Sequence, residues 1–223
     1  MKRNVIPELL DSDSGTPAEI AASFSDLRRI NQWFGGIATA ESLVRYVASQ
    51  SEARSFSLLE VAAGSGDVPR AAGERLQRHG IQIEVSLLDR AVSHLENRSN
   101  GARAIGGDAL ALPFADATFD LVSCCLFAHH LSPSDLLRFG NEALRVCRVA
   151  VLINDLIRHP LHLALVYAGW PLYSSRLTQH DAPASVRAAY TAKEMHEMLS
   201  QTSTRGIVMR RHYLFRMGVV VWK

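Results

Sequence analysis

The stretch LLEVAAGSGDV (residues 58–68) decides the fold class of this chain. A short apolar run ends in a glycine-containing turn, and the segment VPRAAGERLQRHG that follows has the pattern of a helix. Glycines at 64 and 66 let the backbone turn tightly and let a ligand approach without a Cβ in the way. A doubly wound α/β fold places a nucleotide-like ligand at such a turn. An ordinary tight turn between strand and helix is the alternative.

Outward from this turn, short apolar runs alternate with helical patterns. The runs IEVSLLD, ARAIGGD, ATFDLVSCCLF and VAVLINDL follow in order, separated by AVSHLENR and by a helix from Ser132-Pro133 to about Arg148. Ser132 suits the N-cap of that helix and Pro133 its first position. This alternation predicts βαβ units around a buried parallel sheet, and the tail RGIVMRRHYLFRMGVVVWK predicts two further strands.

The ends of the chain differ from this central pattern. Apolar residues at spacings of three and four predict helices over residues 17–50, divided at Gly35-Gly36. Residues 1–20 and 156–190 are interrupted by prolines, and we expect them to be irregular, with a helix in the second segment. Thr191-Ala192-Lys193-Glu194 forms a capping box that predicts a helix to about Gln201.

Two acidic residues follow the second and third predicted strands. Asp89 ends one strand, where an acid can accept hydrogen bonds from ribose hydroxyls, and Asp108 ends the next. The carboxyl ends of parallel strands form the edge at which open α/β sheets bind ligands. Single solvated Asp residues at strand ends are common, so the prediction depends on the glycine turn and both acids together.

An NAD-dependent oxidoreductase of the Rossmann type is the main alternative. Its G-x-G-x-x-G fingerprint requires a third glycine, but this chain has GSGDVP. Asp67 at the start of the helix would repel a pyrophosphate and would suit a ligand with a cationic amino-acid end. This pattern favours S-adenosylmethionine over NAD.

Composition excludes several other classes of protein. The chain has 223 residues, 48% of them apolar, which suits one substantial domain. The net charge of +2 gives no reason to expect a nucleic-acid partner. Three cysteines without framework spacing indicate reduced thiols and a cytoplasmic location. No run is long enough for a signal peptide or a transmembrane segment.

The motifs LLEVAAGSGD, LLD and GDALALPFADATFDLV resemble the successive motifs of class I S-adenosylmethionine-dependent methyltransferases. The resemblance covers roughly residues 55–155. It implies a doubly wound α/β fold, a Rossmann-like methyltransferase fold with a seven-stranded, mostly parallel sheet, a C-terminal antiparallel hairpin and N-terminal helices. It also implies an enzyme with S-adenosylmethionine as cofactor and S-adenosylhomocysteine as product. Ala62 departs from the family, which usually has a glycine there.

The resemblance assigns cofactor contacts by position. Glu60 touches the methionine amino group, the loop residues lie under the methionine and ribose, Asp89 binds the ribose, and Asp108 accepts from the adenine amine. The full set of implied cofactor-binding residues is Glu60, Ala62, Gly64, Gly66, Asp89, Arg90, Asp108, Ala109, Cys125, Phe127 and His130.

The stretch CCLFAHHL (residues 124–131) allows a metal site, a catalytic base or a structural strand end. Neighbouring Cys124 and Cys125 on a strand point to opposite faces, so they cannot easily ligate one ion, and we expect no metal. In the methyltransferase family a histidine here serves in some members as general base on an acceptor hydroxyl and in others only shapes the pocket. Imidazole titrates near neutral pH, so a general base is chemically reasonable here, and the candidate catalytic residues are His129 or Asp155. A structural histidine bonded to the loop backbone is the alternative.

The segment after the fifth predicted strand is the candidate acceptor side. Its polar residues within NDL, RHPL, SRL, HD and SVR resemble a bacterial subgroup associated with polyketide and phenolic-lipid biosynthesis, which is similar to the quinone-biosynthesis methyltransferases. Near the N-terminus, Arg29, Trp33 and Phe34 are candidates to close over the site, or Trp33 and Phe34 simply pack on the sheet edge. The predicted substrate-binding residues are Trp33, Arg158, His159, Arg176 and His180.

We therefore expect one domain over residues 1–223. It comprises an N-terminal helical lid (1–50), a cofactor-binding core (55–155), an acceptor-side insertion (156–190) and a final helix with hairpin (191–223). The expected reaction is methyl transfer to a small molecule, as O-methylation of a phenolic or polyketide hydroxyl or as C-methylation. The expected state is a monomer or homodimer. The alternatives are the NAD-dependent oxidoreductase and a non-catalytic methyltransferase-like binding module.

Overall fold

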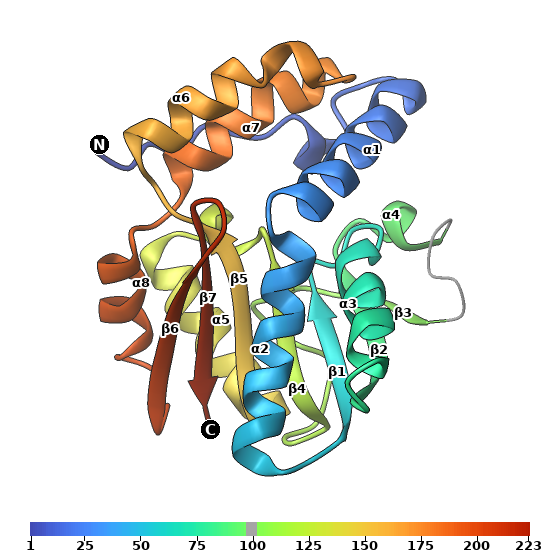
Figure 1. The fold of residues 1–223 in the computed structure, drawn as a ribbon, viewed down its shortest axis with the longest axis vertical. Helices are drawn as coiled ribbons and strands as arrows, with labels where there is room; N and C mark the ends of the chain where they lie inside the picture. Colours follow the sequence, from blue (N-terminus) through green and yellow to red (C-terminus); the bar gives the residue numbers. More distant parts are fainter. Residues whose placement is uncertain (97–101) are drawn as a thin grey trace.

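The computed structural model describes residues 1–96 and 102–223, and its strands form one seven-stranded sheet (Figure 1). The spatial order is β3-β2-β1-β4-β5-β7-β6, and β7 runs antiparallel to its neighbours β5 and β6. The other described pairings are parallel. The strands are β1 Ser55–Val61, β2 Gln82–Asp89, β3 Arg103–Gly106, β4 Phe119–Cys125, β5 Cys147–Leu156, β6 Gly206–His212 and β7 Arg216–Trp222. The predicted doubly wound sheet with its C-terminal antiparallel hairpin is confirmed.

The chain reverses its direction across the sheet between β1 and β4. From β1 it proceeds through β2 to β3, and from β4 it proceeds the other way. The carboxyl ends of β1 and β4 therefore flank the switch point, where open α/β sheets have a ligand-binding crevice. Figure 1 shows these ends pointing toward the upper part of the molecule.

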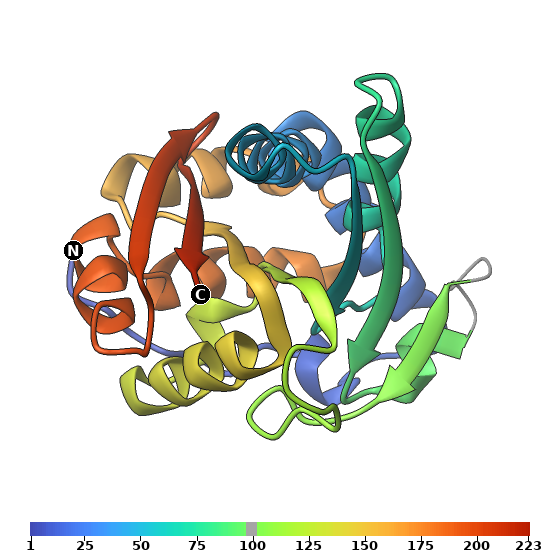
Figure 2. The same ribbon diagram turned by 90° about the horizontal axis from the view of Figure 1, so that it is seen from below.

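Helices cover both faces of the sheet. Figure 2 shows α2 and α3 on one face and α5 and α8 on the other. The bounds are α2 Gly36–Ser51, α3 Asp67–Gln77, α4 Val92–Glu96, α5 Pro133–Val146 and α8 Ala192–Leu199. The predicted helix boundaries at Gly35-Gly36, at Ser132 and at the Thr191 capping box agree with the structure. The last two residues of the predicted AVSHLENR helix lie outside the described residues.

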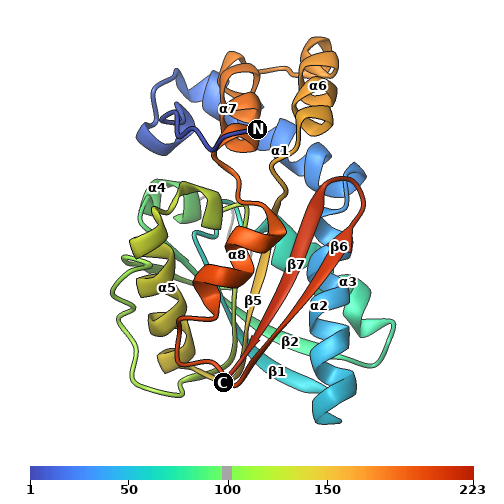
Figure 3. The same cartoon turned by 90° about the vertical axis from the view of Figure 1, so that its left-hand side faces the viewer.

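A third group of helices lies above the carboxyl ends of the parallel strands (Figures 1 and 3). It contains α1 Pro17–Trp33, α6 Pro160–Ala168 and α7 Arg176–Ala188, with short 3-10 turns at Leu10–Ser12, Ala128–His130 and Trp170–Leu172. The expectation of an irregular segment over residues 156–190 was wrong in extent, because two helices form there. Pro160 occupies the first helical position of α6, where its missing N–H costs nothing, and Pro183 is accommodated inside α7.

The N-terminal segment is irregular, as predicted, but it is held by polar contacts. The Arg3 side chain donates to the main-chain oxygens of Ala188 at 2.7 Å and of His129 and Leu131 at 2.9 Å each. Further along, Asp181 accepts from the backbone N–H groups of Leu9 and Leu10. The segment is thereby fixed across the end of β4 and along α7.

The apolar core lies on both faces of the sheet. One cluster joins the α5 and α8 side to the central strands around Phe139, and the other joins α2 and α3 to the opposite face around Leu43 and Leu76. Strands buried on both faces explain why β4 and β5 are continuous apolar runs without alternation. Among the described residues, no helix combines the length and apolar character required to cross a bilayer.

Candidate active site

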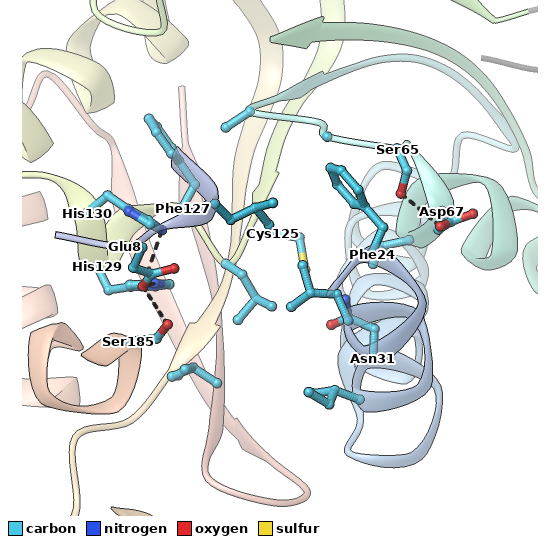
Figure 4. Close-up of a pocket in the computed structure, with 18 of the residues that line it drawn as sticks. Glu8, Phe24, Asn31, Ser65, Asp67, Cys125, Phe127, His129, His130 and Ser185 are labelled. Atoms are coloured by element: carbon cyan, nitrogen blue, oxygen red, sulfur yellow. Dashed lines mark hydrogen bonds and ion pairs between the residues drawn. The ribbon is translucent and has the colours of Figure 1, made fainter. Parts of the chain in front are cut away.

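One large cavity, of about 880 Å³, lies between the carboxyl ends of the strands and the upper helices. Its lining comes from the loops after β1, β2, β3 and β4, from α1, α6 and α7, and from the N-terminal segment. Figure 4 shows Glu8, His129 and Ser185 on one side of it and Phe24 and Asn31 from α1 on the other. Its volume lies at the upper end of the range usual for small-molecule and cofactor sites.

The turn after β1 has the backbone geometry that its glycines predict. Ala62, Gly64 and Gly66 all have positive φ, at 53°, 50° and 66°. Alanine pays a conformational cost there that glycine does not, so Ala62 marks a strained point. A Cβ on Gly66 would lie 2.6 Å from Cδ1 of Leu87. Gly66 is absent from the cavity lining and acts on the turn itself, whereas Ala62 and Gly64 line the cavity.

The acids at the ends of β2 and β3 lie along the same cavity. Asp89 accepts from the backbone N–H of Gly64 at 2.7 Å and of Ala91 at 2.9 Å, so it fixes the glycine turn. Asp108 is exposed and accepts from Leu110 N at 2.9 Å. Arg90 and Ala109 also line the cavity. The predicted adenosine side of the site is therefore brought together, and its individual contacts remain predictions.

Glu60 on β1 is buried, and its side chain accepts a hydrogen bond from the hydroxyl of Ser123 on β4. Burial raises the pKa of Glu60 to about 7, against the lowering effect of that hydrogen bond. The residues at the end of β4 that were predicted to adjoin the cofactor, Cys125 and Phe127, line the cavity as well. Burial also raises the pKa of Cys125 to about 12, so its thiol stays protonated.

Asp67 does not face a ligand freely. It accepts from Ser65 Oγ at 2.8 Å, from two nitrogens of Arg28 at 3.1 Å each and from Arg70 at 3.1 Å. The prediction that its charge suits a cationic ligand end is corrected, because two arginines already neutralise it. The pair Arg28–Asp67 instead ties α1 to α3.

His129 lies between two carboxylates. Its Nδ1 is 2.7 Å from Asp155 Oδ1, and its Nε2 is 3.4 Å from Glu8 Oε1, within ion-pair range but not aligned for a hydrogen bond. Burial lowers the pKa of His129, but the charges of Asp155 and Glu8 outweigh it and raise the pKa to about 10. The imidazole is thus cationic at neutral pH while Glu8 stays in place. Glu8 also accepts from Ser185 Oγ at 2.5 Å.

His130 has a different environment. Its Nδ1 is 2.9 Å from Asp11 Oδ2, its ring stacks on Phe127, and it lines the cavity. Glu8, His129 and His130 each offer a ligand atom within 4.8 Å of the others, a spacing that could hold a metal ion. Ion pairs of the two imidazoles with Glu8 and Asp11 also explain why these side chains lie together. The expectation of no metal stays a prediction.

The predicted substrate residues are not gathered in one place. Trp33 lines the cavity and is 61% exposed. Arg158 is buried against Glu194 and the Ala189 carbonyl, and His159 caps α6. The last two pair with acids: Arg176 with Glu19, and His180 with Asp181. The cavity lining does not include Arg158, His159, Arg176 or His180. Their positions therefore give no support to the predicted contact with substrate.

The proposed lid residues at the end of α1, Arg29, Trp33 and its C-cap residue Phe34, all line the cavity. Arg29 lines the cavity and pairs with Asp26, which also accepts from the backbone N–H groups of Ser174 and Ser175. Phe34 lines the cavity and is 41% exposed, so it is not packed into the core.

Several cavity residues were not predicted from sequence. They come from the N-terminal segment, α1, α7 and β7, and the chief ones are Glu8, Asp26, Asn31, Ser185 and Arg216. Their contacts join positions up to 185 residues apart, and no local pattern marks them. Only folding brings them to the ends of β4 and β5.

The comparisons with known proteins agree with this geometry. A family model described as a methyltransferase domain matches residues 58–149. The chain carries a class I S-adenosylmethionine-dependent methyltransferase domain. The predicted family resemblance is thereby confirmed, and the matched part of the methyltransferase contains the glycine turn, Asp89, Asp108 and His129. No curated protein matches the sequence.

Solved structures share the fold of this methyltransferase at low sequence identity. The plantazolicin methyltransferase BpumL in complex with SAH is 12% identical, with a TM-score of 0.69 over 96% of this chain and 94% of that one. The plantazolicin methyltransferase BamL is 14% identical, with a TM-score of 0.67 over 92% and 91%. Human N-acetylserotonin methyltransferase, in complex with SAM, is 13% identical, with a TM-score of 0.63 over 88% of this chain and 53% of that one.

Proposed function

We propose that this chain transfers the methyl group of S-adenosylmethionine to a hydroxyl of a small, largely apolar acceptor of phenolic or polyketide type. The observation that carries the proposal is a single cavity with two chemically different ends. One end has the glycine turn and the strand-end acids of a methyltransferase domain, and the other has the buried His129–Asp155 pair.

The cofactor end has the donors and acceptors that S-adenosylmethionine requires. Asp89 sits beside the glycine turn, in position for ribose hydroxyls. Glu60 is a buried carboxyl with no cationic partner among the described residues, which suits a ligand that brings an ammonium group. The cofactor supplies an activated methyl group on a sulfonium. The chain's own task is then to orient the acceptor, exclude water and manage one proton.

The acceptor end is proposed to handle that proton at His129 Nε2. Asp155 accepts from Nδ1, so it fixes the tautomer and leaves Nε2 toward Glu8 and the cavity. An acceptor hydroxyl that displaces the Glu8 carboxylate from Nε2 would remove one of the two charges that keep the imidazole protonated. His129 then either takes the hydroxyl proton as methyl transfer proceeds or stabilises an acceptor that arrives as a phenolate.

The proposed acceptor class follows from the lining on this side. Leu27, Ile30, Leu165, Val166 and Leu172 provide apolar surface, and Trp33, Phe34 and Tyr173 provide aromatic surface. An aromatic or polyketide body with one reactive hydroxyl fits this combination. Glu8, His130 and Ser185 form a polar group around His129, and we expect the hydroxyl at that end.

The decisive experiment incubates the purified protein with S-adenosylmethionine and a panel of phenols, hydroxyquinones and polyketide pyrones. Mass spectrometry should show an acceptor gaining one methyl group together with S-adenosylhomocysteine. A methoxy resonance in the NMR spectrum of the product identifies O-methylation, whereas a carbon-bound methyl resonance identifies the C-methylating alternative. Binding of S-adenosylhomocysteine without turnover on any acceptor would favour a non-catalytic binding module. Binding of NADH in its place would overturn the proposal.

We also propose a cytoplasmic location and a monomeric or homodimeric state. Support for the location comes from Cys124, Cys125 and Cys147, which are free thiols in the structure. Fractionation of the native host and light scattering of the purified chain test the two statements separately.

A further inference from the structure

Arg216, the first residue of β7, is a buried cation that lines the cavity and has no acidic partner in the described part of the chain. Its side chain is 1% exposed. It donates to Asn31 Oδ1 at 2.7 Å, to Phe34 O at 3.1 Å and to Asn154 Oδ1 at 3.3 Å, with Cys125 Sγ at 3.9 Å. Among the described residues, no carboxylate lies within 4.0 Å of it. A guanidinium keeps its charge, and neutral amide and carbonyl oxygens do not balance that charge, so the position suits an anionic ligand group.

The strand registers place Arg216 and Glu60 in one row across the sheet. Glu60 on β1 is opposite Ser123 on β4, and Cys125, two residues on, is opposite Asn154 on β5. Asn154 is in turn opposite Gly218, two residues from Arg216. Residues two apart on a strand, and residues directly opposite on neighbouring strands, point to the same face. The four polar side chains in this row are Glu60, Ser123, Asn154 and Arg216.

The long Arg216 side chain reaches back along this row as far as Cys125. Cys125 belongs to β4, the strand that pairs with β1, so the guanidinium extends toward the strand that carries Glu60. A buried carboxyl without a cation and a buried guanidinium without an anion thus line one cavity wall. An α-amino-acid end, with an ammonium and a carboxylate a few ångströms apart, satisfies both.

We propose that Arg216 is a carboxylate-binding residue that, together with Glu60, receives the α-amino-acid end of S-adenosylmethionine. This inference rests on the proposed function. It adds to that function two residues, Arg216 and Asn31, that lie outside the matched methyltransferase domain. The side-chain amides of Asn154 and Asn31 hold the guanidinium in place. The Asn154 side chain donates from Nδ2 to Gly36 O at 2.8 Å and so turns its oxygen toward Arg216. A Cβ on Gly36 would lie 2.2 Å from Asn31 Oδ1, so glycine lets the second amide approach.

The test is Asn31→Asp, which keeps the shape of the side chain and adds a carboxylate beside the guanidinium. The internal anion then competes with the ligand carboxylate, and we expect calorimetry to show S-adenosylhomocysteine binding weakened about tenfold or more. Binding of 5′-methylthioadenosine, which has the adenosine part but no amino-acid end, should change less than about twofold. Asn141→Asp, at an exposed position of α5 outside the cavity lining, adds the same charge and is the matched control, with both affinities expected unchanged.

Arg216→Gln gives the second variant, with its fold checked by circular dichroism. The same selective loss of S-adenosylhomocysteine affinity is expected. Unchanged affinity in Asn31→Asp, or an equal loss for both nucleosides, overturns the inference. A rise only in the KM of an anionic acceptor also overturns it, since the guanidinium would then serve the acceptor. Failure of the wild-type protein to bind either nucleoside defeats the proposed function itself and is distinguishable from all of these outcomes.

Discussion

His129 and Asp155 form a buried pair that joins the end of β4 to the end of β5. Nδ1 of His129 lies 2.7 Å from Oδ1 of Asp155, and the main-chain N–H of His129 donates to Oδ2 at 3.0 Å. Their side chains are 2% and 1% exposed. Burial raises the pKa of Asp155, but the charge and hydrogen bonds of His129 lower it overall, so the carboxylate stays ionised. The pair therefore holds the ring in one orientation, with Nε2 toward Glu8.

Asp155→Asn should reduce turnover strongly. The amide cannot hold Nδ1–H in the same tautomer, and its loss of charge weakens the proton affinity of the ring. We expect kcat to fall roughly 10²- to 10⁴-fold, the range usual for loss of general acid–base catalysis. Affinity for S-adenosylhomocysteine should stay within about twofold, because Asp155 is not among the cavity-lining residues. Parallel rate and calorimetry measurements check this; an equal loss in both would indicate a merely structural residue.

His129→Gln and His130→Gln form a matched pair of variants on neighbouring residues. The first removes the proposed proton acceptor and should cost roughly 10²- to 10⁴-fold in kcat. The second removes a ring that pairs with Asp11 near the surface, and it should retain activity within about tenfold. Rates with one phenolic acceptor measure both. Comparable losses in the two variants would argue that the loop, and not one imidazole, matters.

Glu8→Gln should change the pH dependence of the reaction. Glu8 helps to raise the pKa of His129 to about 10, so the neutral imidazole accumulates only at high pH. Without that charge the pKa falls, and the rise of kcat/KM with pH should move to lower pH. A pH–rate profile of both proteins on the same acceptor measures the shift. An unmoved profile would mean that His129 does not titrate in the reaction.

The raised pKa of His129 also predicts how the free energy of unfolding depends on pH. The folded-state pKa of His129, about 10, lies above its ordinary value of 6.5. The stabilisation from its protonation is therefore fully present below pH 6.5 and is lost as the pH rises toward 10. Urea unfolding of the wild type across this window should show a falling free energy of unfolding. The His129→Gln variant should show a flatter curve.

Glu60→Gln tests the second raised pKa, that of a buried carboxyl, which acts with the same sign over a lower pH window. Burial raises the folded-state pKa of Glu60 to about 7 from 4.5, so the folded protein retains a proton that the unfolded chain releases. Its contribution makes the free energy of unfolding fall as the pH rises between these values, and the glutamine variant should lack that slope. If Glu60 meets the cofactor ammonium, S-adenosylhomocysteine binding near about pH 6 should also release a proton. Calorimetry in buffers of different ionisation enthalpy detects it, and its absence in the wild type would remove Glu60 from the cofactor site.

The fold was predictable because its signals are local. The β1 run, the turn with Gly64 and Gly66 and the following helix occupy consecutive residues, and so do the other βα units. The spacing of apolar residues and the residue types of turns depend on short stretches of chain, so both can be recognised directly in the sequence. The same holds for the Ser132 and Thr191 caps, which depend on residues three positions apart.

The site was only partly predictable, because half of it is made by distant contacts. The sequence by itself determined the strand ends, the glycine turn and the position of His129 on its loop. Tertiary structure decided that Asp67 faces Arg28, that Glu8 lies beside His129, and that Arg158 is buried away from the cavity. Polar side chains such as Arg216 and Asn31 acquire their chemistry from partners up to 185 residues away, and no local pattern encodes such a meeting. Short-range patterns determine the strands, helices and turns, whereas long-range packing determines which charged side chains meet and which of them face the cavity.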